Sequence, residues 1–127
     1  MSDLCFMPAS EAIRLMRQKK LSPVELMTAV LERINSLEPQ INAFSALDAE
    51  GALSGARSAE AKLAEGNNIL GPLHGIPLTI KDLASVEGLP FQRGSRIEAN
   101  NIGVADAPFV SRLRKSGAII LGKTTTS

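Results

Sequence analysis

The sequence is poor in the residues that build disulfides, metal sites and aromatic cores. Cys5 is the single cysteine, His74 is the single histidine, and tryptophan and tyrosine are absent. One cysteine excludes an intramolecular disulfide and is typical of a reducing compartment. Without a second histidine or a group of cysteines, no metal site of the zinc type is expected. We therefore expect a protein with no metal and no other cofactor, whose core is built mainly from aliphatic side chains.

The chain also lacks a strong charge of either sign and any long apolar run. Its formal net charge of +1 is too small to steer a protein to nucleic acid or to an anionic membrane. No apolar stretch approaches the roughly 20 residues that span a bilayer. In residues 1–20 the basic cluster follows the apolar residues, whereas a secretory signal has the opposite order. These features predict a soluble cytoplasmic protein that contacts neither nucleic acid nor membrane directly.

Local patterns predict four helices, over about residues 10–20, 23–38, 48–65 and 107–116. The clearest start is Ser22-Pro23-Val24-Glu25, where serine occupies the N-cap, proline the first helical position and glutamate the third position of a capping box. Pro39 is expected to end this helix, because proline interrupts the hydrogen-bond ladder. The N-caps expected for the other three helices are Ser10, Asp48 and Asp106.

Three short strands are predicted, over about residues 42–47, 76–82 and 118–122. Strand, loop, helix and strand from Leu78 to Leu121 form a βαβ unit, so the last two strands should be parallel. The long connection over residues 91–106 reads as irregular, and loops of this length tend to be functional. So few strands leave a sheet edge open. The 127 residues are therefore expected to begin a larger α/β domain.

Residues 117–124, GAIILGKT, match the phosphate-binding pattern G-x-x-x-x-G-K-[ST] letter for letter. That loop must follow a strand and open a helix, so that its amides face the phosphates. Here the first glycine follows a helix and the four residues after it are strand formers. We therefore reject nucleotide binding and expect Lys123 to be a lysine at the end of a strand.

The stretch over residues 71–82, GPLHGIPLTIKD, closely resembles the amidase signature family. The resemblance continues in residues 86–90 (VEGLP), 93–95 (RGS) and 106–124, and upstream in residues 21–26, 32–34 and 41–44. It covers nearly the whole chain in the right order, which makes it far more specific than any single motif. The fold that it implies for residues 1–127 is a set of N-terminal helices followed by the first βαβ unit of a mixed sheet, incomplete at its C-terminus.

Members of this family hydrolyse or transfer carboxamide groups with a Ser–cis-Ser–Lys triad, and Lys81 matches the lysine. A lysine acts as a base towards serine only when burial lowers its pKa towards neutrality. Lys81 is flanked by Ile80 and Leu83, so we expect it to be desolvated. Asp82 is expected to orient Lys81, to bind loop amides, or to have a surface or capping role. The residues expected to shape turns around the site are Gly75, Gly94 and Ser95, and His74 is expected to be a loop residue.

The chain departs from the family in one large respect. The family's serines lie in a downstream Gly/Ser-rich segment, and none of the serines here, including Ser95, Ser111 and Ser127, has a Gly-Gly-Ser-Ser-Gly context. We therefore expect the 127 residues to be inactive alone and the complete enzyme to act on a small amide substrate. The alternative is a non-catalytic remnant that binds a partner or forms a homo-oligomer through its open sheet.

Overall fold

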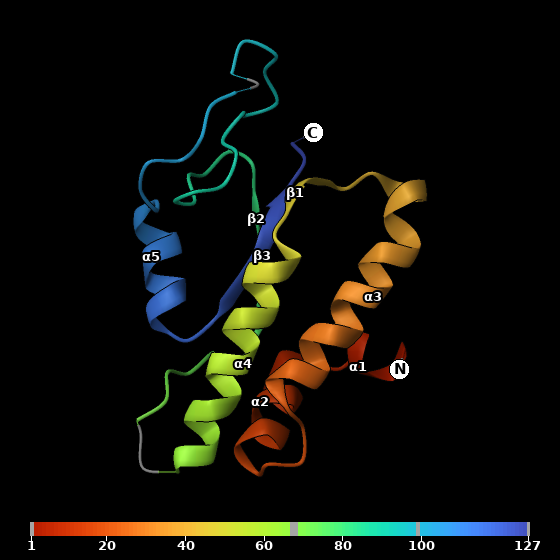
Figure 1. Ribbon diagram of the computed structural model, residues 1–127, viewed down its shortest axis with the longest axis vertical. Helices are drawn as coiled ribbons and strands as arrows, with labels where there is room; N and C mark the ends of the chain where they lie inside the picture. The colour runs from red at the N-terminus through yellow and green to blue at the C-terminus, as the bar shows by residue number, and fades with distance from the viewer. Residues whose placement is uncertain (1, 67–68, 99, 127) are drawn as a thin grey trace.

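Five helices and three strands are seen in the computed structural model, which describes residues 2–66, 69–98 and 100–126 (Figure 1). Ser127, and Ala99 of the predicted long loop, lie outside the described residues. In chain order the elements are α1 (Ser2–Cys5), α2 (Ala9–Arg17), α3 (Pro23–Ile41), β1 (Phe44–Leu47), α4 (Ala49–Glu65), β2 (Pro77–Lys81), α5 (Pro108–Lys115) and β3 (Ile119–Thr124). None of the described helices is long and apolar enough to cross a membrane.

The three strands form one mixed sheet in the order β1-β3-β2. β2 and β3 run parallel, as the βαβ pattern predicts, and β1 pairs with β3 in the antiparallel sense. Leu121 of β3 packs against α3 and α4, whereas Ile120 packs against Val110 of α5 on the other face. The sheet therefore lies between α5 on one face and α3 with α4 on the other (Figure 1).

A bulge shifts the register between β2 and β3. Leu78 lies opposite Ile120, but the next residue, Thr79, lies opposite Gly122, so that Leu121 is passed over. Beyond this point Ile80 pairs with Lys123. Because neighbouring residues of a strand point to opposite faces, a slip of one residue changes the face that a side chain occupies. The bulge thus places Lys123 on the same face as Ile80.

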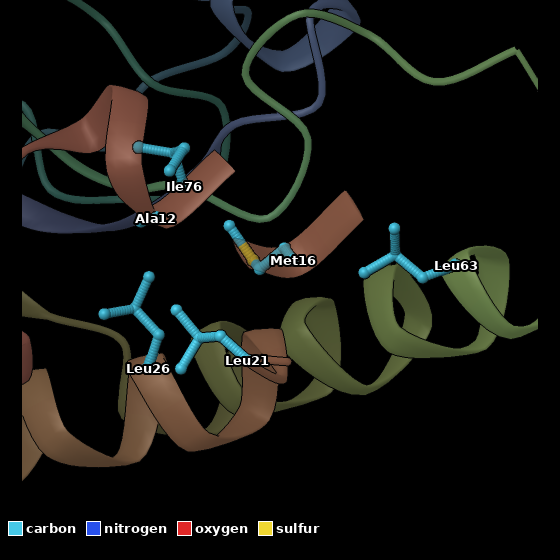
Figure 2. Close-up of a cluster of buried hydrophobic side chains, with 6 residues drawn as sticks. All are labelled: Ala12, Met16, Leu21, Leu26, Leu63 and Ile76. Atoms are coloured by element: carbon cyan, nitrogen blue, oxygen red, sulfur yellow. The ribbon is translucent and has the colours of Figure 1, made fainter. Parts of the chain in front are cut away.

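A cluster of aliphatic side chains joins the N-terminal helices to the start of β2. Its buried members are Ala12, Met16, Leu21, Leu26, Leu63 and Ile76 (Figure 2). They come from α2, the turn between α2 and α3, the start of α3, the end of α4 and the residue before β2. The cluster therefore packs these elements together at the end of the sheet opposite Lys81. As the scarcity of aromatics predicts, it contains no ring.

The helix α3 begins as predicted but ends later than predicted. The Ser22 hydroxyl accepts from the amide of Val24 at 3.0 Å, as an N-cap should. Pro39 lies inside the helix, which continues to Ile41, so the expectation that Pro39 ends it was wrong. The proline falls in the last turn, where its missing N–H removes a single ladder bond. The Glu38 carboxylate also accepts from the two amides that follow the helix, at 2.9 and 2.8 Å.

Two of the other expected N-caps were wrong. Ser10 lies inside α2, whose N-cap is Pro8. Asp106 does not cap α5, whose N-cap is Ala107. The Asp106 carboxylate instead accepts from the Glu87 amide at 2.8 Å and from Arg114 Nε at 2.7 Å, so it ties α5 to the loop after β2.

The third expected cap is confirmed. The Asp48 carboxylate accepts from the Gly51 amide at 3.1 Å at the start of α4.

Candidate functional site

Lys81 is the last residue of β2, and its backbone is held on both sides. The amide of Asp82 donates to the Thr124 carbonyl at 2.9 Å, which continues the pairing with β3. The carbonyl of Lys81 accepts from the amides of Leu83 and Ala84, at 2.7 and 3.2 Å, in the turn that follows. The main chain that carries Lys81 is therefore fixed.

The side chain of Lys81 is exposed, so the expectation that it would be desolvated was wrong for these residues. Ile80 and Asp82 both point into the interior, and Lys81, between them, must point to the other face. That face of β2 is open, because Thr79 on the same face is also exposed. Among the described residues, no group hydrogen-bonds the ammonium of Lys81.

Lys81 lines an open cleft of about 460 Å³ along β2, which we call the Lys81 cleft. Its other lining residues are Leu78, Thr79, Ile80, Leu83, Ala84, Phe109 and Leu113. Leu83 and Phe109, which both line the cleft, are 57% and 50% exposed, so the cleft has an exposed apolar rim. Lys81 carries the only charge in this lining, so any segment that covered the cleft would remove the ammonium from water.

Asp82 and Lys123 form a buried ion pair on the opposite face. Lys123 Nζ lies 2.7 Å from Asp82 Oδ1, and the two side chains are 3% or less exposed. Lys123 is the second-last residue of β3, close to the strand end that the sequence suggested, and its side chain is buried. Its ammonium is enclosed and paired, which offers no phosphate-binding loop and agrees with the rejection of a nucleotide site.

The ion pair also holds the beginning of the long loop. Lys123 Nζ donates to the Pro90 carbonyl at 3.1 Å and lies 5.1 Å from the centre of the Phe91 ring. The Gln92 amide donates to the Asp82 carboxylate, 3.2 Å from Oδ2. Of the three roles expected for Asp82, the contact with a loop amide is therefore the one that the structure contains.

A second, polar cleft of about 510 Å³ opens at the carboxyl ends of β2 and β3. It is lined by Ser45, Asp82, Gln92, Gly94, Ser95, Arg96, Thr125 and Thr126. Gly94 and Ser95 thus line the same cleft as Asp82, whereas Lys81 lines a different one. The Ser95 hydroxyl accepts from the Ile97 amide at 3.2 Å, so it shapes the loop.

Two other residues singled out in the sequence lie far from Lys81. Gly75, with φ of 85°, precedes β2 and contacts Met16, so it shapes the turn at the opposite end of the strand. His74 is 8% exposed, and its Nε2 lies 2.9 Å from the Ala59 carbonyl of α4. His74 therefore joins the turn before β2 to α4. Within the described ranges, no group of three or more histidine, cysteine or acidic residues is arranged to hold a metal ion.

An exposed ion pair closes the part of the loop that borders the polar cleft. Arg93 Nε donates to Glu98 Oε2 at 3.0 Å. The hydrogen bond from Arg93 holds the pKa of Glu98 below its ordinary value, while the Asp82 carboxylate acts in the opposite direction.

Known proteins resemble this chain in sequence and in fold. The profile of the Amidase family matches residues 25–127. The chain is 41% identical over 124 residues to a glutamyl-tRNA(Gln) amidotransferase subunit from Acidothermus cellulolyticus and covers 24% of that protein. It is 39% identical over 124 residues to an acylamidase of Rhodococcus erythropolis and covers 26% of it. These matches span 98% of the chain.

A bacterial aryl acylamidase of the amidase signature family has the same fold over this segment. Its solved structure superposes with a TM-score of 0.86 at 25% identity, over 93% of this chain and 25% of that one. The fold and the matches define an α/β segment that this chain shares with amidases. The chain belongs to the amidase signature family. It spans about a quarter of the length of the relatives that it matches.

The sequence did not reveal the role of Lys123. The strand pattern predicts Lys123 at a strand end and the resemblance includes residues 122–124, but neither indicates a partner for the lysine's charge. The available signal was the parallel pairing of residues 76–82 with 118–122, which brings Lys123 to the end of β2 that carries Asp82.

Proposed function

We propose that the chain supplies the N-terminal part of an amidase signature enzyme that hydrolyses or transfers carboxamide groups. Lys81 is the lysine of a Ser–cis-Ser–Lys triad, and both serines lie outside these residues. The observation that carries the proposal is the place of Lys81, on a fixed strand end with its amine facing an open apolar cleft. The names of the relatives, an acylamidase and a glutamyl-tRNA(Gln) amidotransferase, support an amide as the substrate.

The chemistry that follows for Lys81 is general-base catalysis. A serine hydroxyl attacks an amide carbon only when a base takes its proton. Lys81 accepts that proton once the remainder of the domain covers the Lys81 cleft, because a desolvated amine holds a proton less tightly. Lys123 is unsuited to this role, since its ammonium is enclosed between a carboxylate and a carbonyl.

The exposed apolar rim of the cleft supports the same proposal. Leu83 and Phe109 lie along β2. Among the described residues β2 pairs only with β3, so its other edge is free. The remainder of an amidase domain would cover this rim. The alternative is a second copy of the chain, which would make it a self-associating module without catalysis. A dimer in light scattering that L83S dissociates would favour that alternative.

A hybrid protein tests the proposal. Residues 1–127 replace the matched segment of the Rhodococcus erythropolis acylamidase, and turnover of that enzyme's own amide substrate is measured. We expect the hybrid to hydrolyse the amide and the 127-residue chain to be inactive. A well-folded hybrid without activity, next to an active parent enzyme, would count against the proposal.

A further inference from the structure

We propose that the buried Asp82–Lys123 pair positions Lys81. The pair fixes the backbone that carries Lys81, and the Lys123 ammonium neutralises the Asp82 carboxylate next to that residue. The two are positioning residues, since neither reaches into the Lys81 cleft. The inference rests on the proposed role of Lys81.

The ion pair acts mechanically on the backbone of Lys81. Asp82 is bonded directly to Lys81, and its carboxylate is held by Lys123 on β3 and by the Gln92 amide of the loop. Ile80, the residue before Lys81 in the chain, is 4% exposed and packs against α5. Both neighbours of Lys81 are thus anchored on one face of the sheet. The alternation of a strand then directs Lys81 to the opposite face.

Stability alone is a poor explanation for this pair. Removing two charges from water costs several kcal/mol per ion, and an apolar pair of the same volume often serves a fold equally well. The ion pair supplies direction that an apolar pair lacks. The Lys123 ammonium donates to the Asp82 carboxylate and to the Pro90 carbonyl, so it links β3 to the end of β2 and to the loop that follows.

The ion pair also acts electrostatically on the amine of Lys81. An uncompensated carboxylate beside Lys81 would favour its charged ammonium form, which cannot accept a proton. Lys123 cancels that charge at 2.7 Å. Other charges near this end of β2 are Arg96 and the Arg93–Glu98 pair, which belong to the loop beyond Asp82. The remaining lining of the Lys81 cleft carries no charge.

The test uses the 127-residue chain and needs no activity. The amines are labelled with trace acetic anhydride from pH 6 to 12, and labelling at Lys81 is read by mass spectrometry, with exposed Lys62 as the internal reference. K123Q leaves the Asp82 carboxylate uncompensated. It should raise the pH at which labelling of Lys81 is half-maximal by about half a pH unit. D82N should move it down by about as much. The double variant should return it to the wild-type value.

Opposite shifts at Lys81, with Lys62 unchanged, are the expected result. Midpoints that shift in the same direction in both folded single variants, or that do not shift, would overturn the proposal. The ion pair would then have a structural role only. If a single variant fails to fold, the neutral D82N/K123Q double variant decides by hydrogen exchange. Amides 82–84 should exchange at least about tenfold faster while that of Ile120 is unchanged. Equal rates at amides 82–84 in the wild type and the double variant would overturn the proposal.

The two proposals fail separately. If the K81A hybrid remains active, the proposed function is contradicted, whatever the labelling shows. An inactive K81A hybrid combined with unshifted labelling removes only the role of Asp82 and Lys123.

Discussion

Lys123 Nζ and Asp82 Oδ1 meet at 2.7 Å between two parallel strands, and neither side chain is more than 3% exposed. Lys81, the residue next to Asp82, is exposed on the other face. At this end of the sheet Lys123 of β3 is buried and paired, whereas Lys81 of β2 is exposed and its backbone is held by hydrogen bonds. This arrangement is the one that the proposed roles require, with Lys123 compensating the Asp82 charge and Lys81 acting as the base.

Removing the Lys123 ammonium should strongly destabilise the fold. K123M leaves a buried carboxylate without its cation, and breaking such a pair costs about 3–5 kcal/mol. The free energy of unfolding, measured by urea denaturation, should fall by that amount. The matched control, K62M on the exposed face of α4, should change it by less than about 0.5 kcal/mol. Equal effects of the two substitutions would mean that the ion pair does not form in solution.

The N-cap of α3 should contribute measurably to stability. Ser22 accepts from the Val24 amide and donates to the Glu60 carboxylate of α4, so it serves both helices. S22A should lower the free energy of unfolding by about 1 kcal/mol. Ser54 is exposed inside α4, and S54A should be neutral or slightly stabilising, because alanine is the better helix former. A neutral S22A would contradict the capping role.

The Arg93–Glu98 pair should be visible in a pH titration. The hydrogen bond from Arg93 lowers the pKa of Glu98 below its ordinary value. A carboxylate with a lowered folded-state pKa stabilises the fold above its unfolded pKa, and this contribution is lost as the pH falls through the folded pKa. In R93Q the Glu98 carboxyl, followed by NMR, should titrate at higher pH than in the wild type.

Glu11 provides the control for that titration. Its pKa is lowered by a hydrogen bond from Arg14 on the same helix, a different pair from Arg93–Glu98. R93Q should leave the Glu11 titration unchanged. A Glu98 titration that stays in place in R93Q would show that the loop pair is absent in solution.

Two glycines with positive φ should respond differently to alanine. At Gly117, φ is 98° and an added Cβ would lie 2.6 Å from His74 Cα. At Gly88, φ is 82° but an added Cβ would meet no atom within 4 Å. G88A should cost about 1–2 kcal/mol from backbone conformation alone. G117A should cost clearly more, because the turn at His74 must move; thermal denaturation that ranks G88A as more harmful would contradict this.

The elements with local signals were the ones that the sequence predicted well. The Ser22-Pro23 start of α3, the Asp48 cap of α4 and the parallel pairing of β2 with β3 follow from capping chemistry and βαβ topology, and all three are present. Ser10 failed as a cap because α2 begins before it, at Ala9, and Asp106 failed because competing partners decide where a polar side chain binds. Asp106 binds Arg114 and the Glu87 amide, residues that its local pattern does not include.

The candidate site was less predictable, for a specific physical reason. Without the bulge at Leu121, Lys123 would lie opposite Lys81, and its side chain would leave the face of Asp82. One unpaired residue therefore creates the ion pair, and the strand pattern does not specify it. The flanking apolar residues predict a covered Lys81, but they do not cover it, because Leu83 is itself exposed.

The most direct test of Lys81 as the base is the activity of the acylamidase hybrid when this lysine alone is changed. K81A should lower kcat/KM for the amide by at least about 10³-fold, in the range expected for removal of a general base. K62A, which removes an exposed lysine of α4, should leave kcat/KM unchanged. A K81A hybrid that retains activity within about tenfold of the unmodified hybrid would contradict the assignment of Lys81 as the base.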